Sequence, residues 1–267
     1  QIASTLTECL PEPGTCEAPF NTTITQNLDA ADVSVGGVAC QADNITTENS
    51  WARSYDLSVE IPGQEFTINC VAFGATNSDS AIDLLGTITI YRDTNGGEPG
   101  SPGDDLVELG STEFTLAAGT DGTLFSAPFD PPIVAPADST IVVAMDLPSL
   151  QDLGGDGFAV YSGNSAGESR CTYLLSESCG ITTYTCAGDL GPFGDLHWLQ
   201  ILRGNVGGGQ PCPWDLNDSS DVGILDLLTL LAAWGPCPAP CPPDFDGSGT
   251  VDIFDLLTLI ANWGACP

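Results

Sequence analysis

The C-terminal part of the chain contains a tandem repeat of one sequence unit. Residues 212–238 read CPWDLNDSSDVGILDLLTLLAAWGPCP, and residues 241–267 read CPPDFDGSGTVDIFDLLTLIANWGACP. When the two stretches are aligned from their first cysteines, 16 of the 27 positions are identical. Each unit starts with an Asp-rich stretch and continues with apolar residues at helical spacing, which predicts a loop followed by one short helix. Gly235 and Gly264 fit the C-caps of these helices.

The Asp-rich stretches have the spacing of calcium ligands. Calcium takes six to eight oxygen atoms, which a twelve-residue loop supplies from positions 1, 3, 5, 7, 9 and 12, with Gly at position 6. The second unit has Gly249 at position 6, whereas the first has Ser220 there and only Gly223 at position 9. We therefore predict two calcium sites, the first weaker than the second; the alternative is a pair of Asp-rich turns that cap helices. The expected ligands are Asp215, Asn217, Ser219, Asp221 and Asp226 in the first loop and Asp244, Asp246, Ser248, Thr250, Asp252 and Asp255 in the second, with Asp221 and Thr250 acting through their backbone carbonyls.

Two loop-and-helix units in tandem resemble the dockerin type I module, which packs two such units antiparallel. The resemblance covers about a fifth of the chain and implies a small α-helical domain that needs calcium to fold, because its carboxylates would otherwise repel one another. In cellulosomal dockerins, loop positions 10 and 11 help to contact a cohesin and are often Ser-Thr. Here they are Ile224-Leu225 and Ile253-Phe254. These apolar pairs favour packing against the chain's own first domain or a neighbouring subunit over binding to a standard cohesin.

Charge excludes several classes of function. The chain has 36 acidic residues against four Arg, no Lys and one His, which gives a net charge of −32. Ordinary nucleic-acid and anionic-membrane binding need a basic surface, so neither is expected. No stretch approaches the roughly 18 apolar residues of a membrane span. Because the sequence begins at Gln1 and not at Met, we expect a mature secreted protein.

Eleven cysteines without tight Cys-x-x-Cys pairs favour disulfides in an oxidising, extracellular compartment over a zinc site. If the two units pack antiparallel, the start of one lies near the end of the other, which predicts the bonds Cys212–Cys266 and Cys237–Cys241. The other expected bonds are Cys9–Cys16 and Cys40–Cys70. The remaining cysteines, which leave one thiol over, are Cys171, Cys179 and Cys186.

Residues 20–204 have an all-β pattern, in which short runs rich in Val, Ile, Thr and Phe alternate with turn residues. This pattern predicts one antiparallel β-sandwich or jelly roll. The predicted strands are 52–61, 66–73, 87–92, 106–109, 111–116, 123–129, 140–147, 158–161 and 196–202. The stretches WARSYDL, ITIYRDTNGGEPG and CGITTYTCAGDLGPFGDLHWLQILRG resemble a β-sandwich domain of secreted bacterial proteins that occurs beside dockerin-type repeats.

Two further segments complete the organisation. Residues 205–211 form a flexible Gly-rich linker between the sandwich and the repeats at 212–267. Residues 1–19 form an N-terminal extension in which Ile2, Leu6 and Leu10 share one face if the chain is extended. Such a strand could pair with a neighbour's sheet edge, a contact that builds open filaments.

Catalytic signals are weak, and we expect no enzymatic activity. His197, the only histidine, lies in the apolar strand pattern LHWLQIL, which favours a structural role. The segment from Asp93 to Asp104 partly matches a calcium loop but has Glu98 at position 6, which favours a solvated hairpin loop. Outside the repeats, Trp51 and Trp198 are the candidates for a sugar-binding platform.

The leading hypothesis is a non-enzymatic, secreted, calcium-binding structural protein that assembles with copies of itself into an extracellular filament. The alternative is a carbohydrate-binding module that a dockerin-like domain anchors to a scaffold protein.

Overall fold

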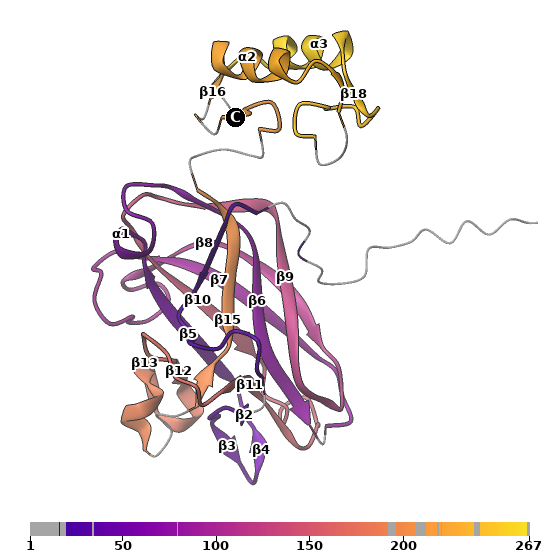
Figure 1. Cartoon of the computed structure of the whole chain (residues 1–267). Coiled ribbons are helices and arrows are strands. Elements are labelled where there is room, and N and C mark those ends of the chain that lie inside the picture. The colour runs from indigo at the N-terminus through magenta and orange to yellow at the C-terminus, as the bar shows by residue number, and fades with distance from the viewer. Residues whose placement is uncertain are drawn as a thin grey trace, which may run out of the picture.

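The computed structural model (Figure 1) describes residues 16, 20–33, 35–78, 80–191, 196–206, 212–217, 219, 221–237 and 241–265. Over these residues the chain is mainly β, as predicted, with two short helices near its C-terminal end. The predictions for residues 1–15, including the face of Ile2, Leu6 and Leu10, lie outside the described residues. The same holds for linker residues 207–211.

One face of the β-region is a seven-stranded sheet built around the long strand β6 (Phe66–Ser78). All its pairings that the structure describes are antiparallel, which agrees with the predicted sandwich. Its other strands are β1 (Thr22–Thr25), β2 (Val35–Gly36), β9 (Thr120–Ala135), β11 (Phe158–Asn164), β14 (His197–Trp198) and β15 (Gln200–Val206).

The opposing face is a six-stranded antiparallel sheet in the order β13-β12-β5-β10-β7-β8. Its strands are β5 (Asn49–Asp56), β7 (Leu84–Asp93), β8 (Leu106–Leu116), β10 (Thr140–Leu147), β12 (Tyr173–Ser176) and β13 (Ile181–Cys186). The smaller elements of the region are the hairpin β3 (Gln41–Ala42) and β4 (Ile45–Thr46), the helix α1 (Leu57–Glu60), and the 3₁₀ turns η1 (Glu177–Cys179) and η2 (Ala187–Leu190).

The main core lies between the two sheets. Successive residues of a strand point to opposite faces, so Ile141, Val143 and Met145 of β10 join this core. Aromatic pairs connect the sheets: Trp51 of β5 meets Tyr161 of β11 edge-on, with ring centroids 5.9 Å apart. Such contacts contribute about 0.5–1.5 kcal/mol each beyond the apolar area that they bury.

Several predicted strand boundaries were wrong. The strand predicted at 52–61 ends at Asp56, because the Asp56 carboxylate accepts a hydrogen bond from the Ser58 backbone N–H and starts the helical turn α1. The two strands predicted at 106–109 and 111–116 are one strand, β8, with a register irregularity beside Gly110. The run predicted at 196–202 is divided between β14 and β15.

The disulfides confirm one predicted pair and correct the others. Cys237–Cys241 is present, whereas Cys9–Cys16 and Cys40–Cys70 were wrong. Cys212 is disulfide-bonded, and its predicted partner Cys266 lies outside the described residues. The observed bonds in the β-region are Cys16–Cys70, Cys40–Cys179 and Cys171–Cys186, so none of Cys171, Cys179 and Cys186 is the leftover thiol.

The disulfide pairing depends on the fold, which brings together cysteines that are far apart in the sequence. The Cα atoms of Cys40 and Cys179, 139 residues apart in sequence, lie 5.9 Å apart, within the reach of a disulfide. The four bonds within the described residues indicate an oxidising, extracellular environment. None of the described helices is long and apolar enough to cross a membrane.

The two repeats pack against each other through matched elements. In each repeat a short strand leads into a nine-residue helix, α2 (Ile224–Ala232) or α3 (Ile253–Ala261), and a second short strand follows. The strand before α2, β16 (Asp221–Val222), pairs with the one after α3, β19 (Gly264–Ala265), and β18 (Thr250–Val251) pairs with β17 (Gly235–Pro236) in the same way. Exchanging each residue for its equivalent in the other repeat converts one ladder into the other, so the repeats are related by an approximate two-fold axis.

The repeats share a small core of their own. Val222 and Val251 occupy equivalent positions, as do Leu230 and Leu259, and all four are buried. Such short helices are marginal in isolation, so this shared core holds them in place. Gly235 and Gly264 are not the C-caps, which are Ala233 and Asn262. Instead, their φ angles of 108° and 122° turn the chain from the helix into the short ladder.

Candidate metal centre

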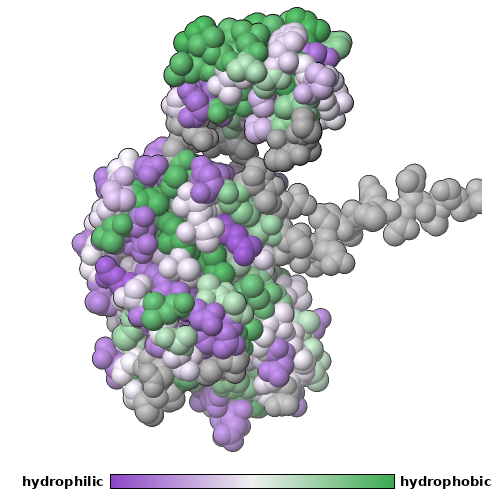
Figure 2. All heavy atoms as spheres, in the orientation of Figure 1, coloured by the Kyte–Doolittle hydropathy of each residue, from purple (hydrophilic) through white to green (hydrophobic). Residues whose placement is uncertain are grey.

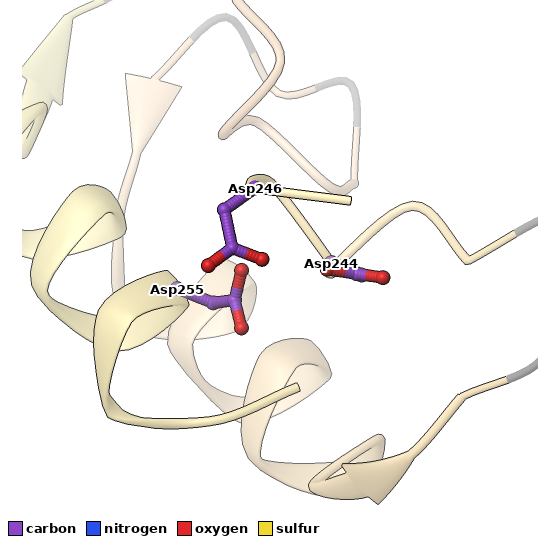
Figure 3. Close-up of side chains that lie close together, drawn as sticks. All are labelled: Asp244, Asp246 and Asp255. Atoms are coloured by element: carbon purple, nitrogen blue, oxygen red, sulfur yellow. The ribbon is translucent and has the colours of Figure 1, made fainter. Parts of the chain in front are cut away.

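Three carboxylates gather in the loop before α3. Asp244, Asp246 and Asp255 each offer an oxygen atom, and these atoms all lie within 4.8 Å of one another. Figure 3 shows the carboxylates of Asp246 and Asp255 facing each other, with Asp244 beside them. Asp255, in the first turn of α3, is buried, whereas Asp246 is exposed. These residues are at positions 1, 3 and 12 of the predicted calcium loop.

Backbone N–H groups hold this loop around its carboxylates. Asp255 accepts hydrogen bonds from the backbone N–H of Phe245 and of Asp252, both at 2.8 Å. Asp244 accepts from Ser248 at 3.0 Å and from Gly249 at 2.7 Å. These hydrogen bonds fold the backbone of the loop around the acidic cluster.

The remaining expected ligands of the second loop take two different roles. The Ser248 hydroxyl donates to the Thr250 backbone carbonyl at 3.1 Å, so these two oxygen atoms lie side by side. Gly249 adopts φ 84°, which is the sharp turn expected at position 6. Asp252 accepts a hydrogen bond from the Phe254 backbone N–H at 2.8 Å and is the N-cap of α3. Capping of a helix by these Asp-rich turns was the alternative to a ligand role, and Asp252 has the capping contact.

The first loop repeats the arrangement with fewer acids at the predicted ligand positions. Buried Asp226 accepts from the backbone N–H groups of Leu216 and Gly223, both at 2.7 Å, as Asp255 does from their counterparts. Ser219 donates through its N–H to Asp215 and through its hydroxyl to the Asp221 carbonyl, both at 3.0 Å. Position 3 is Asn217 here, so the described residues of this loop do not form a cluster of three acids.

The charge of this unit is suited to a cation. Residues 212–267 contain eight Asp and no Lys, Arg or His, so no basic side chain within the unit can neutralise Asp226 or Asp255. Hydrogen bonds from the Ser248 backbone N–H and then its hydroxyl lower the pKa of exposed Asp246 from its ordinary value. The available donors are hard oxygen atoms without thiolate or imidazole, a set that fits calcium and not zinc or copper.

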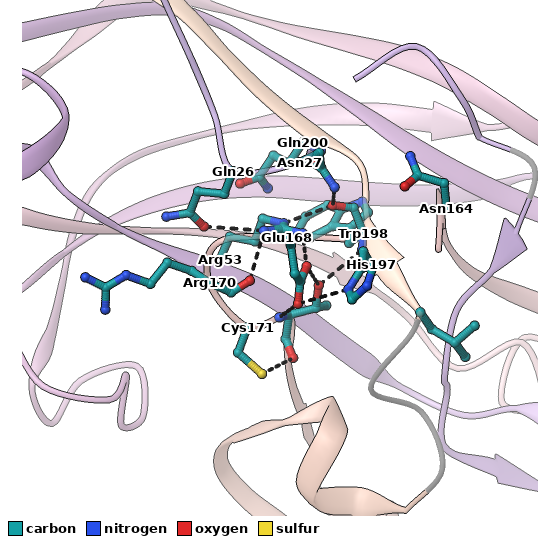
Figure 4. Close-up of polar contacts among 12 residues, drawn as sticks. Gln26, Asn27, Arg53, Asn164, Glu168, Arg170, Cys171, His197, Trp198 and Gln200 are labelled. Atoms are coloured by element: carbon teal, nitrogen blue, oxygen red, sulfur yellow. Dashed lines mark hydrogen bonds and ion pairs between the residues drawn. The ribbon is translucent and has the colours of Figure 1, made fainter. Parts of the chain in front are cut away.

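A second polar cluster lies inside the β-region around buried Arg53 of β5 (Figure 4). Arg53 pairs with Glu168 and donates to the Trp198 backbone carbonyl at 2.9 Å. The Asn27 side-chain amide donates to the same carbonyl, also at 2.9 Å. Because β5 belongs to one sheet and Trp198 to the other, the cluster ties the two sheets together, and removing one partner would leave a buried charge unpaired.

His197 borders this cluster. Its Nδ1 lies 3.3 Å from Glu168 Oε1, close enough for charge attraction if the ring is protonated, but the angle does not make a hydrogen bond. The sequence also contains the pattern Gly163-x-Ser165-x-Gly167, whose first two residues are the end of β11, beside His197 of β14. Ser165 lacks the strained positive φ of a nucleophile elbow, and a bend follows it, not a helix. Among the described contacts, no hydrogen bond joins Ser165 to His197.

Two other sequence candidates are placed by the structure. Trp51 and Trp198 are fully buried, so neither can serve as an exposed sugar platform. The segment after Asp93 joins β7 to β8, as predicted, and Asp93 accepts from the backbone N–H groups of Asn95 and Gly96, both at 2.9 Å. Its described residues do not form a cluster of three acids.

Comparisons with known proteins leave the family open. No family model matches the chain, and no curated protein matches it. Two solved structures of Cwp84 are similar over 60% of this chain. One contains the cysteine protease and lectin-like domains of Cwp84, a surface layer associated protein of Clostridium difficile, with 10% identity and a TM-score of 0.42. The other is the clostridial cysteine protease after propeptide cleavage, with 11% identity and a TM-score of 0.43. The chain spans only about a third of either, 32% and 36%.

Proposed function

We propose that this protein is a non-enzymatic, secreted structural protein whose two C-terminal repeats each bind one calcium ion and which assembles with copies of itself. The observation that carries the proposal is the pair of buried carboxylates, Asp226 and Asp255, in a unit with no basic residue. Burying a carboxylate without a compensating charge is costly. A divalent cation at each loop removes that cost and supports the dockerin-like interpretation of the repeats.

The residues that would hold the ions follow from the loop geometry. In the second loop these are Asp244, Asp246 and Asp255, and the Thr250 backbone carbonyl would supply a further ligand oxygen. In the first loop the equivalent residues are Asp215, Asn217, Asp226 and the Asp221 carbonyl. Bound calcium would supply charge neutralisation and would fix the loops that support both helices.

Self-assembly is supported by the apolar pairs at loop positions 10 and 11. Ile224, Leu225, Ile253 and Phe254 are all exposed, so the described part of the chain does not cover them. This exposure favours a neighbouring subunit, and not the chain's own β-region, as the partner of these apolar pairs. The alternative function, carbohydrate binding, is not supported by its two aromatic candidates, because Trp51 and Trp198 are buried in the core.

Calorimetric titration of the full-length, metal-stripped protein with calcium tests the metal half of the proposal. We expect two ions per chain and a rise in helical circular dichroism during the titration. Magnesium at the same concentrations is the control, because Mg²⁺ loses its water shell reluctantly and demands near-ideal octahedral geometry. Absence of calcium binding at millimolar concentration would overturn the proposal.

A further inference from the structure

The outer surface of the two repeat helices is apolar over its whole length. It carries ten large apolar side chains that are 46–63% exposed. Figure 2 shows hydrophobic residues, in green, gathered over α2 and α3. We call this surface the helix face; its residues fall into five pairs that are equivalent in the two repeats, namely Ile224 and Ile253, Leu225 and Phe254, Leu228 and Leu257, Leu231 and Ile260, and Trp234 and Trp263.

The helix face contains no charge. The sole charged residue of α2 is Asp226 and that of α3 is Asp255, and both point into their loops and are buried. The other acids of the repeats lie in the loops before the helices. In the β-region, by contrast, the described large apolar side chains that are exposed come from separate elements, such as Leu85 of β7, Leu124 of β9 and Leu153 in a turn. A contiguous uncharged patch of this kind marks a site of association.

The size of the helix face is that of a stable protein interface. Ten side chains of roughly 200 Å² each, about half exposed, offer on the order of 1,000 Å², against about 800 Å² per partner in an interface of standard size. A partner with a polar surface would have to bury its polar groups without hydrogen-bond partners, which is unfavourable. A basic partner would be attracted to the acidic loops and not to this face.

A second copy of the chain meets these requirements. It brings an equal, uncharged apolar area, so the strong negative charge of the two chains stays at the edges of the contact. In a two-fold contact each copy uses the same patch, so the helix face of one copy would pack on the helix face of the other. We propose that the helix face is the surface through which two copies of this protein pair two-fold, an inference that rests on the self-assembly part of the proposed function.

Sedimentation velocity of the full-length protein in millimolar calcium, over a range of concentrations, tests the pairing. The test variant is Leu228→Gln with Leu257→Gln; both residues are 55% exposed in mid-helix, and Gln preserves helix propensity. The control is Leu85→Gln with Leu153→Gln, two Leu of the β-region that are 57% and 55% exposed. We expect the test variant to raise the dimer dissociation constant at least tenfold and the control to leave it unchanged.

Tryptophan fluorescence gives an independent readout. Trp234 and Trp263 are half-exposed on the helix face, whereas Trp51 and Trp198 are already buried. Association should therefore shift the emission to shorter wavelength as concentration rises, and the test variant should lack this shift. A second variant, Leu225→Gln with Phe254→Gln, probes another part of the same face and should behave like the first.

The outcomes separate this inference from the broader proposal. If the wild-type protein assembles and both test variants assemble equally well, the helix face is not the contact, although self-assembly stands. If the wild-type protein binds calcium and stays monomeric at every concentration, self-assembly and the helix-face contact are both refuted. The partner that covers the helix face is then a different protein. Calcium titration of each variant shows that it is folded, so a loss of association cannot be assigned to unfolding.

Discussion

Asp226 and Asp255 occupy equivalent positions in the two repeats and make equivalent hydrogen bonds to the backbone. Each is buried in the first turn of its helix, and each accepts backbone N–H groups both from the start of its own loop and from the residue that precedes the helix. Each therefore joins the loop to the helix and places a negative charge where a cation would sit. The loop, the helix and the candidate metal site are in this way one structural unit.

Replacing these carboxylates one at a time should separate the two sites. We expect Asp226→Asn and Asp255→Asn each to weaken calcium binding at its own loop at least tenfold, which corresponds to about 1.4 kcal/mol, because the charge is lost while the shape is kept. Titration calorimetry measures this, with Asp121→Asn on an exposed part of the β-region as the control of equal charge change. Unaltered affinity in both variants would exclude these loops as the metal sites.

The two loops should bind calcium with different affinity. Both loops contain four Asp, but the second has Asp246 where the first has Asn217 and Asp252 where the first has Gly223, so the second loop places more carboxylates at the predicted ligand positions. We expect a two-step binding isotherm in which Asp255→Asn removes the tighter step and Asp226→Asn the weaker one. The reverse assignment would contradict the ranking.

Removal of calcium should loosen the repeats first. Calcium that binds only the folded state stabilises it by about 4 kcal/mol at a thousandfold excess over the dissociation constant. The β-region has its own core and three disulfides within the described residues, so it should stay folded. Hydrogen exchange with and without a chelator measures this; loss of protection in both regions together would show that they do not unfold independently.

Asp146 predicts a pH dependence of stability. Burial raises the pKa of this carboxyl group, and nearby Glu108 adds to the effect, although hydrogen bonds from Ser50 and Thr89 oppose it. The folded state therefore holds the proton more tightly than the unfolded state, and stability falls as the pH rises through the folded-state pKa. We expect Asp146→Asn to stabilise the protein at neutral pH and to have no such effect below about pH 4, where the unfolded carboxyl is also protonated.

Thermal unfolding across this pH range checks the prediction. Exposed Asp152→Asn serves as the control for the change in net charge. A stabilising effect of Asp146→Asn that is equal at neutral pH and in acid would show that the carboxyl pKa is not its cause.

The N-terminal segment can be tested without removing a cysteine of the described disulfides. Deletion of residues 1–12 retains Cys16, which is bonded to Cys70 of β6. If the segment adds a strand to a neighbour, the shortened protein should still pair through the helix face but should no longer form long filaments. Filaments of normal length after the deletion would refute strand donation.

Local patterns in the sequence predicted some features well and long-range ones poorly. The repeats carry their helical periodicity and loop spacing within a few residues, so α2 and α3 followed from neighbours along the chain, and the Cys237–Cys241 bond followed from the expected antiparallel packing of the two units. The bond between Cys40 and Cys179 depends on a sequence separation of 139 residues, which no local pattern encodes. The capping of α1 by Asp56 was missed because one side-chain hydrogen bond outweighed the strand pattern of Ala52–Ile61.

The candidate site was likewise predicted only in part from the sequence. The spacing of Asp244, Asp246 and Asp255 was visible in the sequence, but the exposure of the helix face was not. Exposure depends on which side of a helix meets the partner repeat. Both faces of α2 and α3 are rich in Leu and Ile, so periodicity alone could not separate the buried Leu230 from the exposed Leu228.

Electron microscopy of the full-length protein in millimolar calcium and again after chelation tests the central claim most directly. The account predicts ordered assemblies in calcium that disperse when the ion is removed, because the helix face depends on the calcium-fixed loops. Single, unassembled particles under both conditions, in a preparation shown to bind two calcium ions, would contradict it.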